Sequence, residues 1–174
     1  MKSKTRYAIL GILKTLGPKS GYALKKTMAE STAYFWSESF GSLYPTLAQL
    51  EKEGAIEPRE KGARRSVIYS ITAKGSVELE KWLFLPAEES RPRSEMLLKL
   101  FFSTERPKEV TCEQLRAFRA RAQEQVQLFK QMAEQLRKSS SGDSLKYWLM
   151  TVRLGQLQSE VNFQWCNECL EELR

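Results

Sequence analysis

The stretch of sequence that decides the fold is SFGSLYPTLAQLEKEGAIEPREKGARRSVIYSIT, residues 39–72. Its first part carries apolar residues at helical spacing, which predicts a helix with one buried face. These apolar residues are Phe40, Leu43, Leu47 and Leu50. Gly54 comes directly after this run and suits the left-handed conformation in which many helices end.

The start of this helix has two possible positions, because Ser39 and Ser42 are both good N-cap residues. With Ser42 as the cap, Pro45 lies in the first turn, where its missing N–H costs little. With Ser39 as the cap, Pro45 would remove one interior hydrogen bond and bend the helix. Either start places small polar groups at the N-terminal end, where unpaired N–H groups and the helix dipole favour an anionic partner.

Two short β-prone runs follow, at residues 55–57 and 67–71, on either side of a basic tip at residues 59–65. Helix, tight turn, strand, basic tip and strand are the second half of a winged helix-turn-helix domain. In such a domain the helix enters the major groove of DNA and the tip contacts phosphate. An ordinary amphipathic helix followed by a hairpin is the plainer interpretation. The tip argues against it, since the tip is basic and has few apolar residues to bury.

Residues 41–56, GSLYPTLAQLEKEGAI, resemble the recognition-helix motif of the PadR family of bacterial transcriptional regulators, roughly GTLYPxLxxLExxGLI. Ser42 stands where the family has Thr, and Ala55 stands where it has Leu. Residues 62–75, GARRSVIYSITAKG, resemble the family's wing and the start of its next helix, although many members carry GRxRK at the tip. The Ser-Gly-Tyr sequence at residues 20–22 also resembles a family signature.

Further along the chain the resemblance is looser. Residues 96–102, MLLKLFF, and the helix that carries Trp148 and Trp165 resemble the longer C-terminal, dimer-forming domain of one PadR subfamily. The resemblance implies a homodimeric, sequence-specific transcriptional regulator. It would most often be a repressor, released from a palindromic operator by a small-molecule effector. A winged-helix module that binds protein and not DNA is the alternative function.

Winged-helix geometry selects candidate contacts to DNA. The exposed face of the recognition helix would carry Ser39, Ser42, Tyr44, Pro45, Thr46 and Gln49. Gln49 suits a bidentate contact to adenine best, and Tyr44 suits a flanking phosphate. Phosphate contacts from elsewhere would come from Lys19, Ser20 and Tyr22 at the start of the second helix, and from Lys61, Arg64 and Arg65 in the wing. Tyr22 could equally belong to the core, and the helical pattern places it inward with Leu24 and Met28.

The distribution of charge points to a polyanionic partner for one half of the chain. The 174 residues carry a net charge of +7, and residues 1–85 account for +6 of it, against +1 for residues 86–174. A basic N-terminal half suits a nucleic acid. A chance surplus of solvated cations is the alternative, which charge alone does not exclude.

An enzyme has no positive support in the sequence. The chain has no histidine, which removes the commonest general base and metal ligand, and Asp143 is its one aspartate. Cys166-x-x-Cys169 has metal-like spacing but lies in a helical pattern without a second pair, so packing is favoured over zinc. With Cys112, three cysteines are too few for a disulfide scaffold. We therefore expect no catalytic residues, no metal and no cofactor.

The elements in chain order predict a mainly α fold with a small β-hairpin wing. Residues 1–85 form the winged helix-turn-helix DNA-binding domain, with further helices at about 5–16, 21–31 and 72–85. The polar, proline-containing residues 86–93 read as a linker. Residues 94–174 form an α-helical dimerisation domain, with a short helix at 94–103, a long one capped by Thr111 and ending near Lys138, and a last one capped by Asp143 and ending near Leu173. No membrane span or signal peptide is expected, so the predicted location is the cytoplasm.

Two features bear on assembly and regulation. Both long helices carry apolar stripes that a small winged domain could not cover, which predicts that both stripes are buried in a homodimer. The stripe of the first, near heptad spacing, comprises Leu115, Phe118, Ala122, Val126, Phe129, Ala133 and Leu136. The stripe of the last helix includes Leu145, Trp148, Leu149, Val152, Leu157, Val161, Trp165, Cys169 and Leu173. A flat apolar or phenolic effector could stack on Trp36, Trp148 or Trp165. The alternative is that these tryptophans, and the aromatic run at residues 34–36, serve packing alone.

Overall fold

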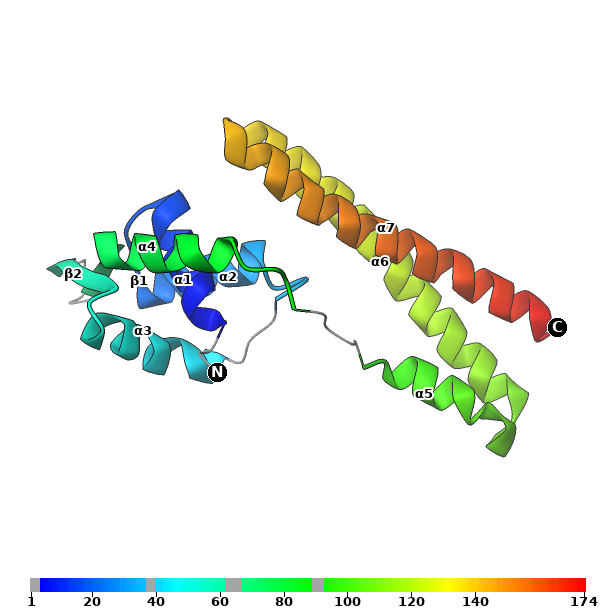
Figure 1. The fold of residues 1–174 in the computed structure, drawn as a ribbon. Helices are drawn as coiled ribbons and strands as arrows, with labels where there is room; N and C mark the ends of the chain where they lie inside the picture. Colours follow the sequence, from blue (N-terminus) through cyan, green and yellow to red (C-terminus); the bar gives the residue numbers. More distant parts are fainter. Residues whose placement is uncertain (1–3, 37–39, 62–66, 89–92) are drawn as a thin grey trace. The chain divides into compact units, whose positions relative to one another are not determined.

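The computed structural model describes residues 4–36, 40–61, 67–88 and 93–174. The chain forms two compact units, Met1–Glu89 and Ser90–Arg174, and each is described by itself (Figure 1). The fold class expected from the sequence, mainly helical with a small winged sheet, is confirmed. Among the described residues, none of the helices combines the length and the apolar character needed to cross a membrane.

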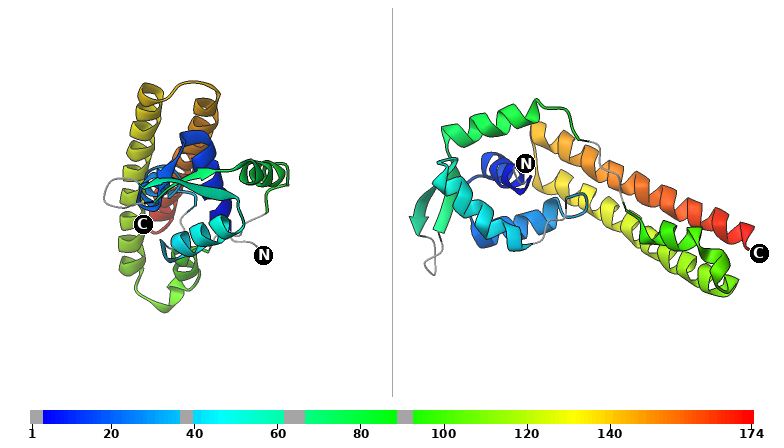
Figure 2. Two further views of the ribbon diagram at one scale, coloured as in Figure 1. Left: turned by 90° about the vertical axis from the view of Figure 1, so that its left-hand side faces the viewer. Right: turned by 60° about the horizontal axis from the view of Figure 1, so that its bottom comes forward.

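In the N-terminal unit, α1 lies between α4 on one side and the α2–α3 pair on the other, with the strands at one end (Figure 1, Figure 2). Its elements are α1 (Thr5–Leu16), β1 (Lys19–Ser20), α2 (Gly21–Ser31), the 3-10 turn η1 (Phe40–Ser42), α3 (Leu43–Lys52), β2 (Ile56–Lys61), β3 (Val67–Ile71) and α4 (Ala73–Leu83). The expected bounds of the first two helices are confirmed. Ser20 and Thr72 cap α2 and α4, because each hydroxyl accepts a backbone N–H of its helix.

The strands form an antiparallel sheet in the order β1-β3-β2. β1 is an addition to the prediction, and it pairs Lys19 with Tyr69 of β3. β2 runs on to Lys61, so the expectation that the strand stops near residue 57 and that residues 59–61 belong to the tip is wrong. The pairing shifts register between Pro58 and Glu60. Such an irregularity accommodates a proline, which has no N–H to donate, and lets the strand continue.

The recognition helix α3 is held by its apolar face. Leu43, Leu47 and Leu50 are each at most 2% exposed and join a core with residues of α1, α2 and α4. Fully burying one such side chain contributes about 1.5–3 kcal/mol. On another side of the same core the ring of Tyr7 stacks on Trp82 with 4.5 Å between ring centroids. The predicted inward face of the recognition helix is thus confirmed for its three leucines.

Both ends of α3 have identifiable causes. The helix begins at Leu43 after the η1 turn, so the start with Ser42 is the one adopted and Pro45 lies in the first turn. Ser42 makes no side-chain capping bond; instead its carbonyl accepts the Thr46 hydroxyl at 2.7 Å. At the other end Gly54 has φ +69, as expected, and the N–H groups of Gly54 and Ala55 bond back to the carbonyls of Glu51 and Leu50.

The C-terminal unit is a helical hairpin with a short helix before it. Its elements are α5 (Glu95–Phe101), the 3-10 turn η3 (Ser103–Glu105), α6 (Lys108–Ser139) and α7 (Asp143–Glu172). α6 and α7 run antiparallel and pack along each other (Figure 1, Figure 2). The two helices approach closely at Gly155, where a Cβ would lie 2.5 Å from Cζ of Phe129. Glycine is required there because the ring fills the space that a side chain would take.

Three expectations for this unit are wrong. α6 begins at Lys108, after Pro107, so Thr111 is a buried interior residue that accepts a hydrogen bond from Arg106 and is not a cap. Asp143 is the first residue of α7 and not its cap, since Gly142 with φ +84 precedes it. The α6 stripe is buried or half-buried within this chain, because α7 covers it. That stripe therefore needs no second subunit.

Candidate nucleic-acid interface

The face of α3 opposite its leucines is open to solvent. Tyr44, Pro45 and Gln49 are exposed, and Ser42 and Thr46 are half-buried. Tyr44 is 58% exposed and lies against the start of α2, since a Cβ on Gly21 would come within 2.9 Å of its Cε1. A glycine at that position allows the two helices to approach closely.

The start of α2 adjoins this face. Lys19 and Ser20 are half-buried in β1, and the Ser20 hydroxyl accepts the N–H of Ala23 at 3.2 Å. Tyr22 is 72% exposed, so the expectation that it points inward is wrong. Gly21, Leu24 and Met28 are the buried positions of α2. Tyr22 follows Gly21 by one residue, about 100° around the helix, and so leaves the buried side.

Much of the basic wing tip lies outside the described residues. Arg64, Arg65 and the side chain of Lys61 belong there, and so does Ser39 before the recognition helix. Within the described part of β2, Arg59 is exposed and its Nε lies 3.9 Å from Oε1 of Glu57. Contacts from the wing tip to phosphate therefore stay a prediction.

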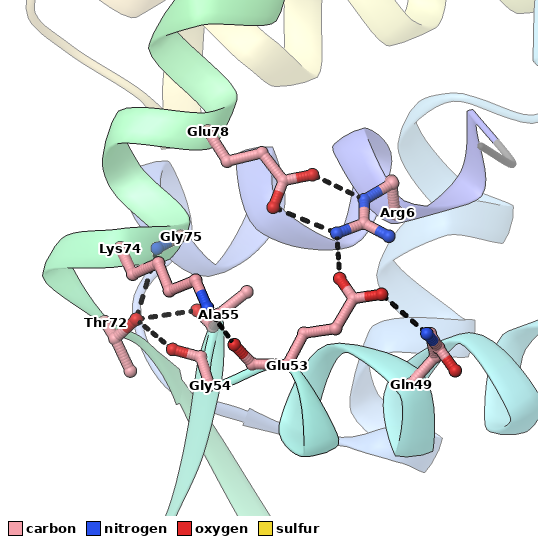
Figure 3. A network of polar contacts seen from close by, with 9 residues as sticks. All are labelled: Arg6, Gln49, Glu53, Gly54, Ala55, Thr72, Lys74, Gly75 and Glu78. Atoms are coloured by element: carbon pink, nitrogen blue, oxygen red, sulfur yellow. Dashed lines mark hydrogen bonds and ion pairs between the residues drawn. The ribbon is translucent and has the colours of Figure 1, made fainter. Parts of the chain in front are cut away.

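Gln49, the expected base reader, is tied into a polar network (Figure 3). Its Nε2 donates to Oε1 of Glu53 at 2.6 Å, and Oε2 of Glu53 lies 2.6 Å from Nη2 of Arg6. Arg6 also meets the carboxylate of Glu78 in a forked arrangement, with Nη2 at 2.9 Å from Oε2 and Nε at 2.7 Å from Oε1. The network joins α1, the end of α3 and α4.

This network stabilises the charged form of the Arg6 side chain. Its side chain is only 5% exposed. Burial opposes the charge, but hydrogen bonds and attraction from Glu53 and Glu78 outweigh it and raise the pKa of Arg6 above its usual value. The Glu78 side chain is only 20% exposed, because its ion pair with Arg6 holds it against α1. Sequence reasoning missed the network, since its members are separated by 47 and 72 residues.

Contacts from the start of α4 also fix the end of α3 (Figure 3). The Thr72 hydroxyl lies 2.8 Å from the carbonyl oxygen of Gly54 and 3.1 Å from that of Ala55. Lys74 donates from Nζ to the backbone carbonyl of Glu53 at 2.6 Å. A Cβ on Gly75 would overlap the carbonyl of Ala55. α4 therefore packs directly on the backbone that links the recognition helix to the wing.

The three candidate effector tryptophans do not form one cluster in the described chain. Trp36 is half-buried in the N-terminal unit, and its Nε1 is buried without a hydrogen-bond partner among the described residues. Trp148 and Trp165 are half-buried on α7, about 25 Å apart at 1.5 Å per residue. Trp165 meets Phe118 of α6 edge to face, with 6.2 Å between ring centroids. For Trp165 the structure thus gives a packing partner.

No metal centre is found in the described residues. They include no group of three or more His, Cys, Asp or Glu side chains that could hold a metal ion. The cysteines are free thiols, and burial, followed by the proximity of Cys169, raises the pKa of Cys166. A buried thiol of raised pKa is poor in thiolate, the form that reacts and binds metals.

Two family models match the chain. Residues 9–81 match the Transcriptional regulator PadR-like family, and residues 92–174 match Virulence activator alpha C-term. Together with the winged fold, these matches define a transcriptional regulator and not an enzyme. Residues 9–81 are thus a PadR-like family domain, and the match of residues 92–174 is consistent with a PadR subfamily that has a longer C-terminal helical domain.

Individual proteins are similar over part or all of the chain. The "Probable transcriptional regulator Rv1176c" of Mycobacterium tuberculosis is 29% identical over 76 residues, which cover 42% of this chain and 40% of that protein. The match thus spans less than half of this curated relative.

Solved structures cover nearly the whole chain. Bacillus subtilis PadR in complex with operator DNA has a TM-score of 0.86 at 24% identity, over 99% of this chain and 100% of that chain. The same protein in complex with p-coumaric acid has a TM-score of 0.83 at 22% identity, over 98% of this chain and 99% of that chain. The Vibrio cholerae virulence activator AphA has a TM-score of 0.76 at 24% identity, over 97% of this chain and 96% of that chain. At these identities the likeness shows a shared fold.

Proposed function

We propose that this chain is a homodimeric transcriptional repressor in the cytoplasm that binds a palindromic operator through the exposed face of α3. The observation that carries the proposal is the two-sided character of this helix. Its leucines are buried, while Tyr44, Pro45 and Gln49 face solvent in the unit whose residues 1–85 carry +6 of the net charge of +7. The operator complex of Bacillus subtilis PadR, which shares the fold, supports this use of the domain.

The candidate residues divide into base readers and phosphate contacts. Ser42, Pro45, Thr46 and Gln49 are proposed to line the groove face of α3, with Gln49 making a bidentate contact to adenine. Phosphate contacts are assigned to Tyr44 and Ser39 on α3's side, to Lys19, Ser20 and Tyr22 around the start of α2, and to Lys61, Arg64 and Arg65 in the wing. Phosphate contacts set affinity and register, whereas base contacts set specificity.

A second copy of the chain would cover apolar surface that the C-terminal unit leaves open. On α7 the exposed residues Tyr147, Met150, Leu154, Leu157 and Val161 alternate in steps of three and four, which is the spacing of a coiled-coil seam. On α5 the exposed apolar residues are Leu97, Leu98 and Phe101, followed by the exposed Phe102 at its C-cap. A two-fold dimer would place two recognition helices in successive major grooves about 34 Å apart.

Release by a small aromatic effector completes the proposal. The complex of Bacillus subtilis PadR with p-coumaric acid supports a ligand of this class. Trp36, Trp148 and Trp165 are the proposed stacking positions. The effector would act by binding the arrangement that does not fit DNA more tightly than the one that does.

Electrophoretic mobility shifts with random genomic fragments at low salt test DNA binding. A winged-helix module that binds only protein would shift none of them. On a duplex selected by the protein, Gln49→Ala should lose about 1–3 kcal/mol while its affinity for random DNA stays the same. Gln125→Ala, at an exposed position of α6, removes a glutamine amide far along the chain from α3 and should change neither the affinity for the selected duplex nor that for random DNA. Equal losses on both duplexes would show that Gln49 reads no base.

A further inference from the structure

The amide of Gln49 has a fixed orientation in the structure. Its Nε2 donates to the Glu53 carboxylate at 2.6 Å. An ionised carboxylate only accepts hydrogen bonds, so this partner selects the NH₂ end of the amide and turns the oxygen away. The nitrogen carries a second N–H, which together with Oε1 is the donor–acceptor pair that a bidentate contact to adenine uses. The bond to Glu53 therefore leaves the reading pair intact.

Glu53 is in turn held from two other helices (Figure 3). Its side chain is 28% exposed and its Oε2 lies 2.6 Å from the buried guanidinium of Arg6. Glu78 of α4 holds that guanidinium from the other side, and Lys74 donates to the backbone carbonyl of Glu53 at 2.6 Å. Motion of the Glu53 side chain would leave a buried cation with one partner fewer, which makes the arrangement costly to disturb.

Helix preferences do not explain a glutamate at this position. Glu53 occupies the C-cap of α3. The helix dipole disfavours a carboxylate there by about 0.3–1 kcal/mol. The contacts that offset this cost are those to Arg6 and Gln49. Arg6 is an anchor in the core, and Gln49 is the residue expected to read bases.

We propose that Glu53 is a specificity-determining residue that acts without touching DNA: anchored by Arg6, it presents the oxygen and the remaining N–H of Gln49 to the base pair. This inference rests on the proposed DNA-binding function and on Gln49 as the reader of adenine. It assigns the ion-pair network a role beyond the stability of the N-terminal unit. A purely structural network would affect all DNA sequences alike.

The test uses the full-length chain and two duplexes, one selected by the protein from a random-sequence pool and a scrambled version of it. The readout is the ratio of the two affinities at one salt concentration, which cancels changes in the folded fraction. Glu53→Gln keeps the size of the side chain but can turn either a donor or an acceptor toward Gln49. The ratio should fall about tenfold, a loss comparable to that of other orienting partners of functional side chains. Glu51→Gln removes the same charge from the same helix at an exposed position and should leave the ratio unchanged.

A double-mutant cycle isolates the orienting role. Gln49→Ala combined with Glu53→Gln should give the same ratio as Gln49→Ala alone, because Glu53 has nothing to orient once the amide is gone. Additive losses would overturn the inference, and so would a Glu53→Gln variant that weakens both duplexes equally. If that variant does not fold, Arg6→Lys retains the charge without the forked geometry and must lower the ratio for the inference to stand. A wild-type chain that binds no duplex would instead defeat the proposed function.

Discussion

Gly75→Ala tests how tightly α4 is packed on the end of the recognition helix. A Cβ at this position would overlap the carbonyl oxygen of Ala55 and lie 3.0 Å from Cγ1 of Ile71. The overlapped atom belongs to the backbone, and it accepts hydrogen bonds from the N–H and the hydroxyl of Thr72. No flexible side chain can move aside, so α4 itself must shift by about 1 Å or more to regain a van der Waals distance.

The expected cost follows from three contributions. Overpacking of this kind costs about 1–3 kcal/mol, and the backbone contact places it near the upper value. Weakening the two hydrogen bonds from Thr72 adds about 1 kcal/mol. Alanine in place of glycine in a helix returns up to about 1 kcal/mol. The free energy of unfolding of the N-terminal unit should therefore fall by about 3 kcal/mol.

Gly11→Ala in the middle of α1 is the matched control, because a Cβ there meets no atom within 4 Å. It should stabilise the unit by up to about 1 kcal/mol. Urea unfolding followed by tryptophan fluorescence measures both variants, in a chain carrying Trp148→Phe and Trp165→Phe so that the signal comes from the N-terminal unit. If Gly75→Ala and Gly11→Ala shift the midpoint in the same direction, the argued contact between α4 and Ala55 does not exist in solution.

Other parts of the molecule give further expectations. Arg64→Ala with Arg65→Ala should weaken binding to all DNA about equally and reduce the log–log salt slope by about 0.9 for each lost phosphate contact, so an unchanged slope would remove them from the interface. Leu47→Ala should destabilise the N-terminal unit by about 2–5 kcal/mol in urea without changing the ratio of operator to random affinity among folded molecules, and a changed ratio would contradict its place in the core. Leu154→Glu on the exposed seam of α7 should convert a dimer to a monomer in sedimentation at micromolar concentration with an unchanged helical spectrum, whereas a persistent dimer would exclude this seam. Burial and Cys169 raise the pKa of Cys166, so the stability that this thiol contributes should be complete below the ordinary thiol pKa of about 8.5 and be lost as the pH rises toward the pKa of the folded state. Cys166→Ala should flatten this decline of the free energy of unfolding with pH, measured by urea unfolding at a series of pH values. An identical decline in the variant would show that Cys166 does not cause it.

The parts of the fold that could be predicted are those set by local sequence. The spacing of Leu43, Leu47 and Leu50, and the glycine at residue 54, define α3 and its end within twelve residues of chain. Buried helical faces and left-handed glycines act over short ranges, so one sequence reveals them. The winged architecture followed from the same stretch.

What could not be predicted depends on partners far along the chain. β1 spans only Lys19 and Ser20 and exists because β3 lies beside it, which no local pattern indicates. No local pattern pairs Arg6 with Glu78, and only the folded packing of α1 against α4 brings them together. The network around Gln49 therefore could not be predicted from the sequence, although the place of Gln49 on the helix was enough to select it as a candidate base reader.

The measurement that tests the central claim most directly is recovery of bound fragments from a genome-wide pull-down with the full-length protein, followed by competition of the enriched site against random DNA. The account predicts a palindromic site with half-sites about one helical turn, or a multiple of it, apart. It also predicts that Gln49→Ala lowers the enrichment by about 1–3 kcal/mol of specific binding while binding to random DNA persists. Recovery of fragments without a shared site, or full enrichment by Gln49→Ala, would contradict the claim that α3 reads an operator.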